Sequence, residues 1–290
     1  MNLNSIQMST FIKTKNDVKD VFKKCGTCSR TFAHLLNREF THPKEHEERA
    51  LNPLAGGIMN RGYQCGMLWG ASLAVGGEAF CRNKNLYQAN TIAITATQHV
   101  MRSFMERSQT TNCKEIIGYD LNSFFGMAKF MLKVTLQGMN NSHCFNLAEQ
   151  WAPEAIQAAI EGLSDEQAQT TQKPVSCASE VVKNMGGSDE EMVMVAGFAG
   201  GLGLSGNACG ALSAAIWKKM LDWCRENPKK DPPFFNNPAA KKILKSFNEV
   251  TGSDMLCSDI CGRQFDNIQD HTEYINNGGC KKLIRVLSES

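Results

Sequence analysis

Cysteine is the residue type whose number and spacing in this sequence could support chemistry. The 290 residues include twelve cysteines, and eight of them form two sets of four in the same order along the chain. The first set is Cys28, Cys65, Cys113 and Cys144, and the second set is Cys177, Cys209, Cys257 and Cys280. Four thiolates is the ligand number of an iron–sulfur cluster or of a structural zinc ion. Each set is therefore a candidate metal-binding site.

The two sets belong to an internal repeat with an offset of 144 residues, from 56 to 200. The offset relates Cys65 to Cys209 and Cys113 to Cys257, so that the two cysteines of each copy are 48 residues apart. It also relates three glycines of each copy: Gly56, Gly57 and Gly62 in the first, and Gly200, Gly201 and Gly206 in the second. A repeat of this kind predicts two copies of one structural unit.

The six repeated glycines are predicted to contact a bound cofactor. Glycine permits positive φ angles and close approach of the backbone to a ligand. Successive backbone N–H groups in such loops hold anions, as they do around phosphates and iron–sulfur clusters. Neither loop is followed by Gly-Lys-Ser/Thr, so nucleotide binding is not expected.

Several of the repeated cysteines are predicted to begin helices. Asn112 and Ser176 are candidate N-cap residues for Cys113 and Cys177, and residues 277–279 lead into Cys280. The positive end of a helix favours a thiolate over a thiol. We therefore expect the pKa of these cysteines to lie below the unperturbed value of about 8.5.

Two other uses of the cysteines remain open. Cys257 and Cys261 are one helical turn apart, and Cys25-x-x-Cys28 has dithiol spacing, although the βαβ context of a thioredoxin is missing. Thiol–disulfide exchange is therefore the alternative function, and a structural zinc or interaction protein is a third. A buried cysteine also packs as a small apolar residue. We expect this role for the cysteines outside the two sets: Cys25, Cys81, Cys224 and Cys261.

Helical periodicity throughout the chain predicts an all-α fold, a helical bundle of two tandem repeats. The predicted helices lie at 17–40, 64–76, 86–107, 120–138 and 145–160 in the first copy, and at 177–185, 189–198, 208–226, 238–250 and 281–288 in the second. The first copy is assigned to residues 1–160, a linker to 161–175 and the second copy to 176–290. The helices after Cys65 and Cys209 are rich in small residues, which let helix axes approach closely. We expect these two helices to pack together across a pseudo-two-fold axis.

Two further segments have suggestive patterns. His42 and His46 are one helical turn apart, but they do not match His-Glu-x-x-His, and a solvated charged helix is expected over residues 43–49. Residues 124–132 present an apolar helical face that includes Phe124 and Leu132. We expect that face in the core or between the two copies.

The bulk composition narrows the possible partners. The chain is 42% hydrophobic and 21% charged, with a formal charge of +2, so no strong field attracts nucleic acid or an acidic membrane. No apolar run approaches the roughly 20 residues that span a bilayer, and residues 1–15 lack the apolar core of a signal peptide. We expect a cytoplasmic protein that contacts a redox partner protein and forms homo-oligomers.

The repeat resembles the family of redox-active proteins named for their C-GCAxxG-C-C signature, a domain also found in split-Soret cytochromes. The second copy carries the resemblance best, through residues 206–211 (Gly-Asn-Ala-Cys-Gly-Ala), 257–262 and 279–283. The first copy has Met67 in place of the motif alanine, and a longer segment before Cys144. The resemblance implies an all-helical redox protein with an iron–sulfur cluster on its cysteines. Ser29 follows Cys28 where haem attachment needs histidine, so covalent haem is not expected.

Overall fold

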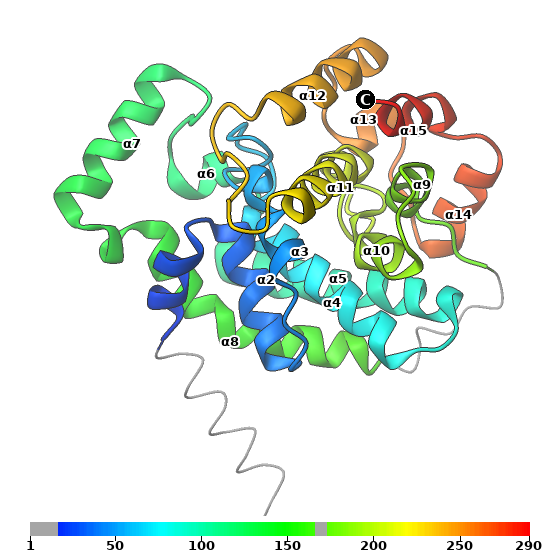
Figure 1. The fold of residues 1–290 in the computed structure, drawn as a ribbon, viewed down its shortest axis with the longest axis horizontal. Helices are drawn as coiled ribbons and strands as arrows, with labels where there is room; N and C mark the ends of the chain where they lie inside the picture. Colours follow the sequence, from blue (N-terminus) through cyan, green and yellow to red (C-terminus); the bar gives the residue numbers. More distant parts are fainter. Residues whose placement is uncertain (1–16, 166–172) are drawn as a thin grey trace, which may run out of the picture.

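A computed structural model describes residues 17–165 and 173–290, and every regular element within these ranges is a helix. The first half contains α2 (Cys28–Glu39), α3 (Glu45–Arg49), η1 (Asn52–Leu54), α4 (Gly66–Arg82), α5 (Leu86–Ser108), α6 (Cys113–Ile117), α7 (Phe124–Gln137), η2 (Met139–Asn141) and α8 (His143–Leu163). The second half contains α9 (Cys177–Asn184), α10 (Asp189–Met194), η3 (Ala196–Phe198), α11 (Gly210–Glu226), α12 (Pro238–Thr251), α13 (Cys257–Cys261), α14 (Ile268–Asn276) and α15 (Lys281–Ser288). The predicted all-α fold with two helical halves is confirmed (Figure 1).

The internal repeat of the sequence is also a repeat of the backbone. The bounds of α4 and α11 differ by the same 144 residues at both ends, as do those of α6 and α13. The Cys65 N–H donates to the Thr111 carbonyl and the Cys209 N–H to the Met255 carbonyl, both at 2.8 Å. Each half therefore ties the start of its central helix to the segment that precedes its third repeated cysteine.

Helix α4 is the central helix of the first half and is buried over most of its length. It packs on α2 and α5, and α10 of the second half covers part of it. A Cβ atom on Gly70 would overlap the backbone of Ser29 in α2, and one on Gly76 would overlap the backbone of Met194 in α10. The small residues of α4 are therefore needed for contacts both within and between the halves.

The prediction that the two central helices pack together is wrong. Within the described residues α4 and α11 share no extended contact, because α11 packs on α9 and α12 instead. In the first half, Gly66 and Gly70 of the central helix face α2, which carries the first cysteine. In the second half, α11 packs on α9, which carries Cys177.

Three local predictions also need correction. The helix predicted over 17–40 is interrupted at Gly26, whose φ is +78°. The segment 43–49 is helical from Glu45, but Glu48 and Arg49 are buried rather than solvated. Helix α14 was not predicted, because its buried residues, His271 and Thr272, do not form an apolar stripe.

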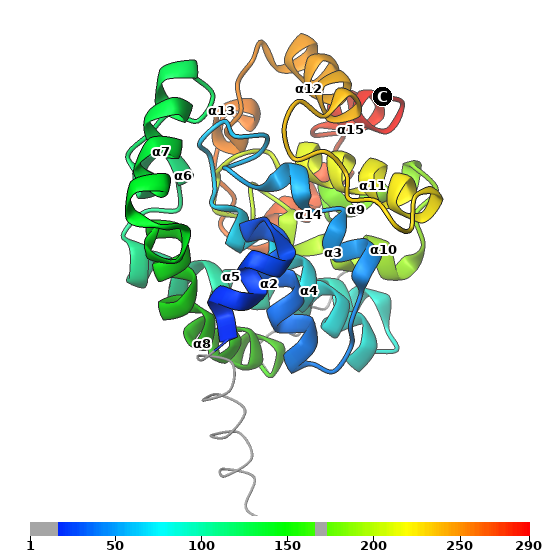
Figure 2. The same cartoon turned by 60° about the vertical axis from the view of Figure 1, so that its left-hand side comes forward.

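Helix α7 lies at the edge of the first half, on the left-hand side of Figure 1, and Figure 2 brings it forward. None of its residues is buried, and Phe124, Phe125 and Leu136 are 81%, 76% and 77% exposed. The prediction that this apolar face lies in the core or between the copies is therefore wrong.

The predicted linker is only partly visible. Helix α8 continues to Leu163, into the segment assigned to the linker, and residues 166–172 lie outside the described residues, as do residues 1–16. Within the described ranges, no helix combines the length and apolar character that crossing a bilayer would need.

Candidate functional site

The four cysteines of the first set come together where four helices begin. Cys28 and Cys113 are the first residues of α2 and α6, Cys65 is the N-cap of α4, and Cys144 is the second residue of α8. The Cys28 and Cys65 thiols are close enough to shift each other's pKa, and Cys65 also interacts electrostatically with Cys113 and Cys144. We call these four residues the first cluster.

The second set lines one small cavity between the starts of α9, α11, α13 and α15. The cavity has a volume of about 10 Å³, counted as the space open to the centre of a water molecule. Its walls include Cys177, Cys209, Cys257 and Cys280, and also Cys261. We call these five residues the second cluster.

Cys261 was assigned to packing by sequence reasoning, and the structure corrects this. Its Sγ lies 3.9 Å from Sγ of Cys257 and 3.7 Å from Sγ of Cys280. The one-turn spacing between Cys257 and Cys261 was the sequence signal for this contact. The comparison of the two copies did not mark Cys261, because the first half has Ile117 at the corresponding position. The second cluster therefore has one thiol more than the first.

Three residues of α14, His271, Tyr274 and Ile275, also line the second cavity and were missed. The Tyr274 hydroxyl lies beside the Cys261 and Cys280 thiols, and burial raises its pKa. The His271 Nδ1 lies 3.1 Å from the Val175 carbonyl oxygen, which only accepts, so Nδ1 carries the proton. Burial lowers the pKa of His271 to about 4, and the ring is therefore neutral at neutral pH.

A turn of unusual handedness precedes the central helix in each half. Residues 56–60 and 200–204 all have positive φ angles, including Ile58 at +60° and Leu202 at +74°. Each non-glycine residue in this conformation costs roughly 1–2 kcal/mol, and strain of this kind gathers at functional sites. At the start of each turn, the backbone of Gly56 or Gly200 is close enough to the thiol of Cys28 or Cys177 to act on its pKa in the lowering direction. The strained turn thus places its backbone next to the first cysteine of each half.

The six predicted glycines, Gly56, Gly57, Gly62, Gly200, Gly201 and Gly206, all have positive φ angles. A seventh glycine that sequence reasoning did not single out is in closer contact with a thiol. A Cβ atom on Gly66 would lie 2.5 Å from the Cys28 sulfur and 3.0 Å from the Ala55 Cα. No side chain fits there while Cys28 keeps its position.

The expected helix-end effect on the pKa values is outweighed at most of the cysteines. Burial raises the pKa of Cys177 to about 11, and that of Cys209 and Cys144 to about 12. Two thiols differ. Hydrogen bonding with Cys65 lowers the pKa of Cys28, and hydrogen bonding with Cys257 and Cys280 lowers that of Cys261 to about 3. Each cluster therefore combines several thiols whose pKa is raised with one thiol whose pKa is lowered.

The sulfur atoms of each cluster are spread more widely than the ligands of a single ion. Among the described residues, no three sulfur atoms of either cluster lie mutually within 4.8 Å. Four thiolates on one tetrahedral ion, each about 2.3 Å from it, would be about 3.8 Å apart. A polynuclear cluster, whose metal atoms take separate thiolates, accepts a wider spacing.

These features define an all-helical protein in which each of two tandem halves gathers cysteines at helix N-termini. The chain belongs to the family described as "Putative redox-active protein (C_GCAxxG_C_C)", whose model matches residues 26–157 and 175–289. One match in each half confirms both the resemblance and the tandem repeat. All twelve cysteines of the chain are free thiols in the structure. No curated protein and no solved structure matches the chain.

Proposed function

We propose that each half binds an iron–sulfur cluster through its four repeated cysteines, and that the protein transfers electrons or senses redox state. The observation that carries the proposal is the convergence of four thiols from four helix N-termini, twice in one chain. The membership of a redox-active family supports iron over zinc, because zinc has no redox chemistry.

The surroundings of the thiols suit an anionic group. Helix N-termini carry a partial positive charge, and every repeated cysteine lies within the first turn of a helix or caps it. The backbones of Gly56 and Gly200 lie close to the Cys28 and Cys177 thiols, and backbone N–H groups surround iron–sulfur clusters in the same way. Cys28, Cys65, Cys113 and Cys144 would hold one cluster, and Cys177, Cys209, Cys257 and Cys280 the other. The bound cluster would supply a one-electron couple.

Anaerobic purification tests this proposal directly. The native protein should be coloured and contain iron and acid-labile sulfide. Cys65→Ser and Cys209→Ser should each lose about half of the iron, and the double variant should lose nearly all of it. Cys25→Ala removes a buried cysteine outside both clusters and should keep the native iron content. A colourless, iron-free protein from the same preparation would contradict the proposal.

A disulfide in the second half is a second candidate function, favoured by the position of Cys261. Its sulfur lies within 3.9 Å of two other thiols. Joining Cys261 to Cys257 or Cys280 would release two protons and two electrons to an acceptor, such as the disulfide of a partner protein. Treatment with oxidised glutathione, followed by peptide mass spectrometry, should then find a disulfide that contains Cys261. Cys261→Ser should prevent it, and an unmodified Cys261 under the same conditions would exclude this chemistry.

A further inference from the structure

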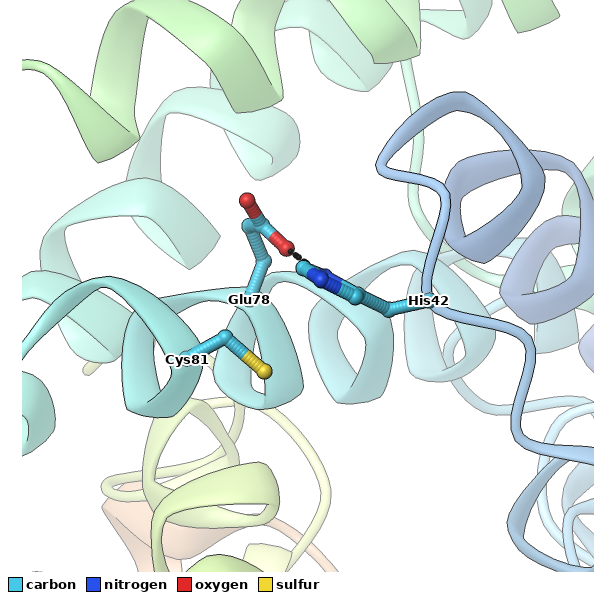
Figure 3. Close-up of side chains that lie close together, drawn as sticks. All are labelled: His42, Glu78 and Cys81. Carbon is cyan, nitrogen blue, oxygen red and sulfur yellow. Dashed lines mark hydrogen bonds and ion pairs between the residues drawn. The ribbon is translucent and has the colours of Figure 1, made fainter.

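We infer that His42, Glu78 and Cys81 form a third metal site, separate from both cysteine clusters, for a divalent ion of the zinc type. Figure 3 shows the three side chains converging beside α4. One ligand atom from each residue lies within 4.8 Å of the other two, the one such group among the described residues.

Two elements bring the three side chains together. Glu78 and Cys81 are three residues apart on α4, which puts them on the same face of the helix. His42 comes from the loop between α2 and α3 and places its Nδ1 2.7 Å from Glu78 Oε2. Glu78 is buried, with 7% of its side chain exposed, whereas the side chain of His42 is 45% exposed. The group is therefore anchored on one side and open to solvent on the other.

The donor set has the chemistry of zinc. Imidazole, carboxylate and thiolate bind zinc at about 2.0–2.3 Å, which requires the donor atoms to be about 3.5 Å apart. Shifts of side chains within the present 4.8 Å would suffice. A thiolate ligand selects zinc or cobalt over magnesium or calcium. Three protein ligands leave a fourth position for water, as in catalytic zinc sites.

The neighbouring charges do not prevent binding. Arg82 Nε lies 2.7 Å from Glu78 Oε1, which leaves Oε2 for the metal and orients the carboxylate, as groups behind metal ligands commonly do. Burial raises the pKa of the Cys81 thiol, and the nearby Lys44 offsets only part of this. The charge of Lys44 is itself paired with Glu190 of the second half. The ion would replace the thiol proton of Cys81, which would pass to solvent. Nδ1 of a neutral His42 ring would bind the ion while Nε2 carries the ring proton.

The second half does not repeat this arrangement. The 144-residue offset relates Glu78 to Asp222 and Cys81 to Arg225. Arg225 is paired with Glu191, at 2.6 Å from Nη1 to Oε1, and Asp222 is paired with Lys218. An ion-paired arginine thus stands where the first half has the thiol. The cysteine of the first half is therefore not a general requirement of this fold.

Cobalt titration of the full-length protein tests the inference. The wild type, purified anaerobically with whatever iron it carries, should bind one equivalent of cobalt more than Cys81→Ser or His42→Gln. The difference spectrum between the wild type and Cys81→Ser should contain a thiolate-to-cobalt charge-transfer band. His46→Gln, four residues from His42 and outside the group, should bind as much as the wild type.

The outcomes are distinct from those of the iron–sulfur test. If Cys81→Ser and His42→Gln each bind one equivalent of cobalt less than the wild type, the site is supported, whether or not the clusters contain iron. Equal cobalt binding by the wild type, Cys81→Ser and His42→Gln would overturn the inference. Both substitutions are at partly or largely exposed positions, and unchanged thermal unfolding would show that the variants are folded.

Discussion

At the scale of single residues, the position of Cys28 depends on the absence of a side chain at Gly66. A methyl group there would lie 2.5 Å from the Cys28 sulfur, with the Ala55 backbone on its other side. We predict that Gly66→Ala displaces Cys28 and removes about half of the bound iron, while the second half keeps its share. Iron analysis after anaerobic purification measures the effect.

Gly77→Ala is the matched control for that substitution, because it lies in the same helix. A methyl group at Gly77 would meet only the flexible ends of two side chains, Lys44 at 3.2 Å and Met194 at 3.7 Å. Alanine favours helix over glycine by about 0.8 kcal/mol, so this variant should keep its iron and be slightly more stable. Equal iron contents in both variants would refute the role assigned to Gly66.

Glu48 makes the stability of the first half depend on pH. Burial alone would raise the pKa of this carboxyl, but hydrogen bonds from His34 and Asn37 outweigh it and hold the pKa below its ordinary value of 4.5. A depressed pKa stabilises the fold above pH 4.5, and this contribution is lost as the pH falls through the value in the folded protein.

We therefore predict that Glu48→Gln costs about 1–3 kcal/mol at pH 7, and that its difference from the wild type shrinks below pH 4.5. Urea unfolding of both proteins at several pH values checks this. A difference that stays constant from pH 7 to pH 3 would contradict the assignment.

At the scale of elements, α7 contributes little to the stability of the folded chain. It has no buried residue, and Leu132 is 60% exposed. We predict that Leu132→Ser changes the free energy of unfolding by less than about 0.5 kcal/mol. By contrast, Leu35→Ala in α2, at a fully buried position, should cost about 2–5 kcal/mol. Urea unfolding of the two variants distinguishes the roles, and a large loss in Leu132→Ser would show that α7 is covered in solution.

At the scale of the whole molecule, the two halves are predicted to unfold together. α4 of the first half packs on α10 and η3 of the second, and the buried Arg49 donates to Asp231 and to the Pro228 carbonyl across the halves. Calorimetry of the reduced, metal-free protein should therefore show one transition. Gly76→Ala, whose new methyl group would overlap the Met194 backbone, should shift that transition down without splitting it. Two separate transitions in the wild type would rule out this coupling.

The sequence predicts the elements and residues that the internal repeat matches between the two halves. It does not predict contacts that depend only on how the helices pack. The matched positions around Cys65 and Cys209 were sufficient for the central helices and for two cysteines of each set. Cys261 was named only as a possible dithiol partner of Cys257 and not as part of a cluster, because no repeated partner marks it. The pairing of His42 with Glu78 joins a loop to a helix 36 residues away, which no periodicity reveals. The exposure of α7 was also hidden, because an apolar stripe looks the same whether or not another element covers it.

The turn before each central helix shows which property outlasted the divergence of the two halves. Ile58, Met59 and Asn60 in one half correspond to Leu202, Gly203 and Leu204 in the other, yet all six have φ angles between +54° and +74°. The side chains have been exchanged while the local chirality of the chain has stayed the same. A comparison of residue types would find no similarity between the copies in this segment, whereas a comparison of backbone φ angles would find the two segments equivalent.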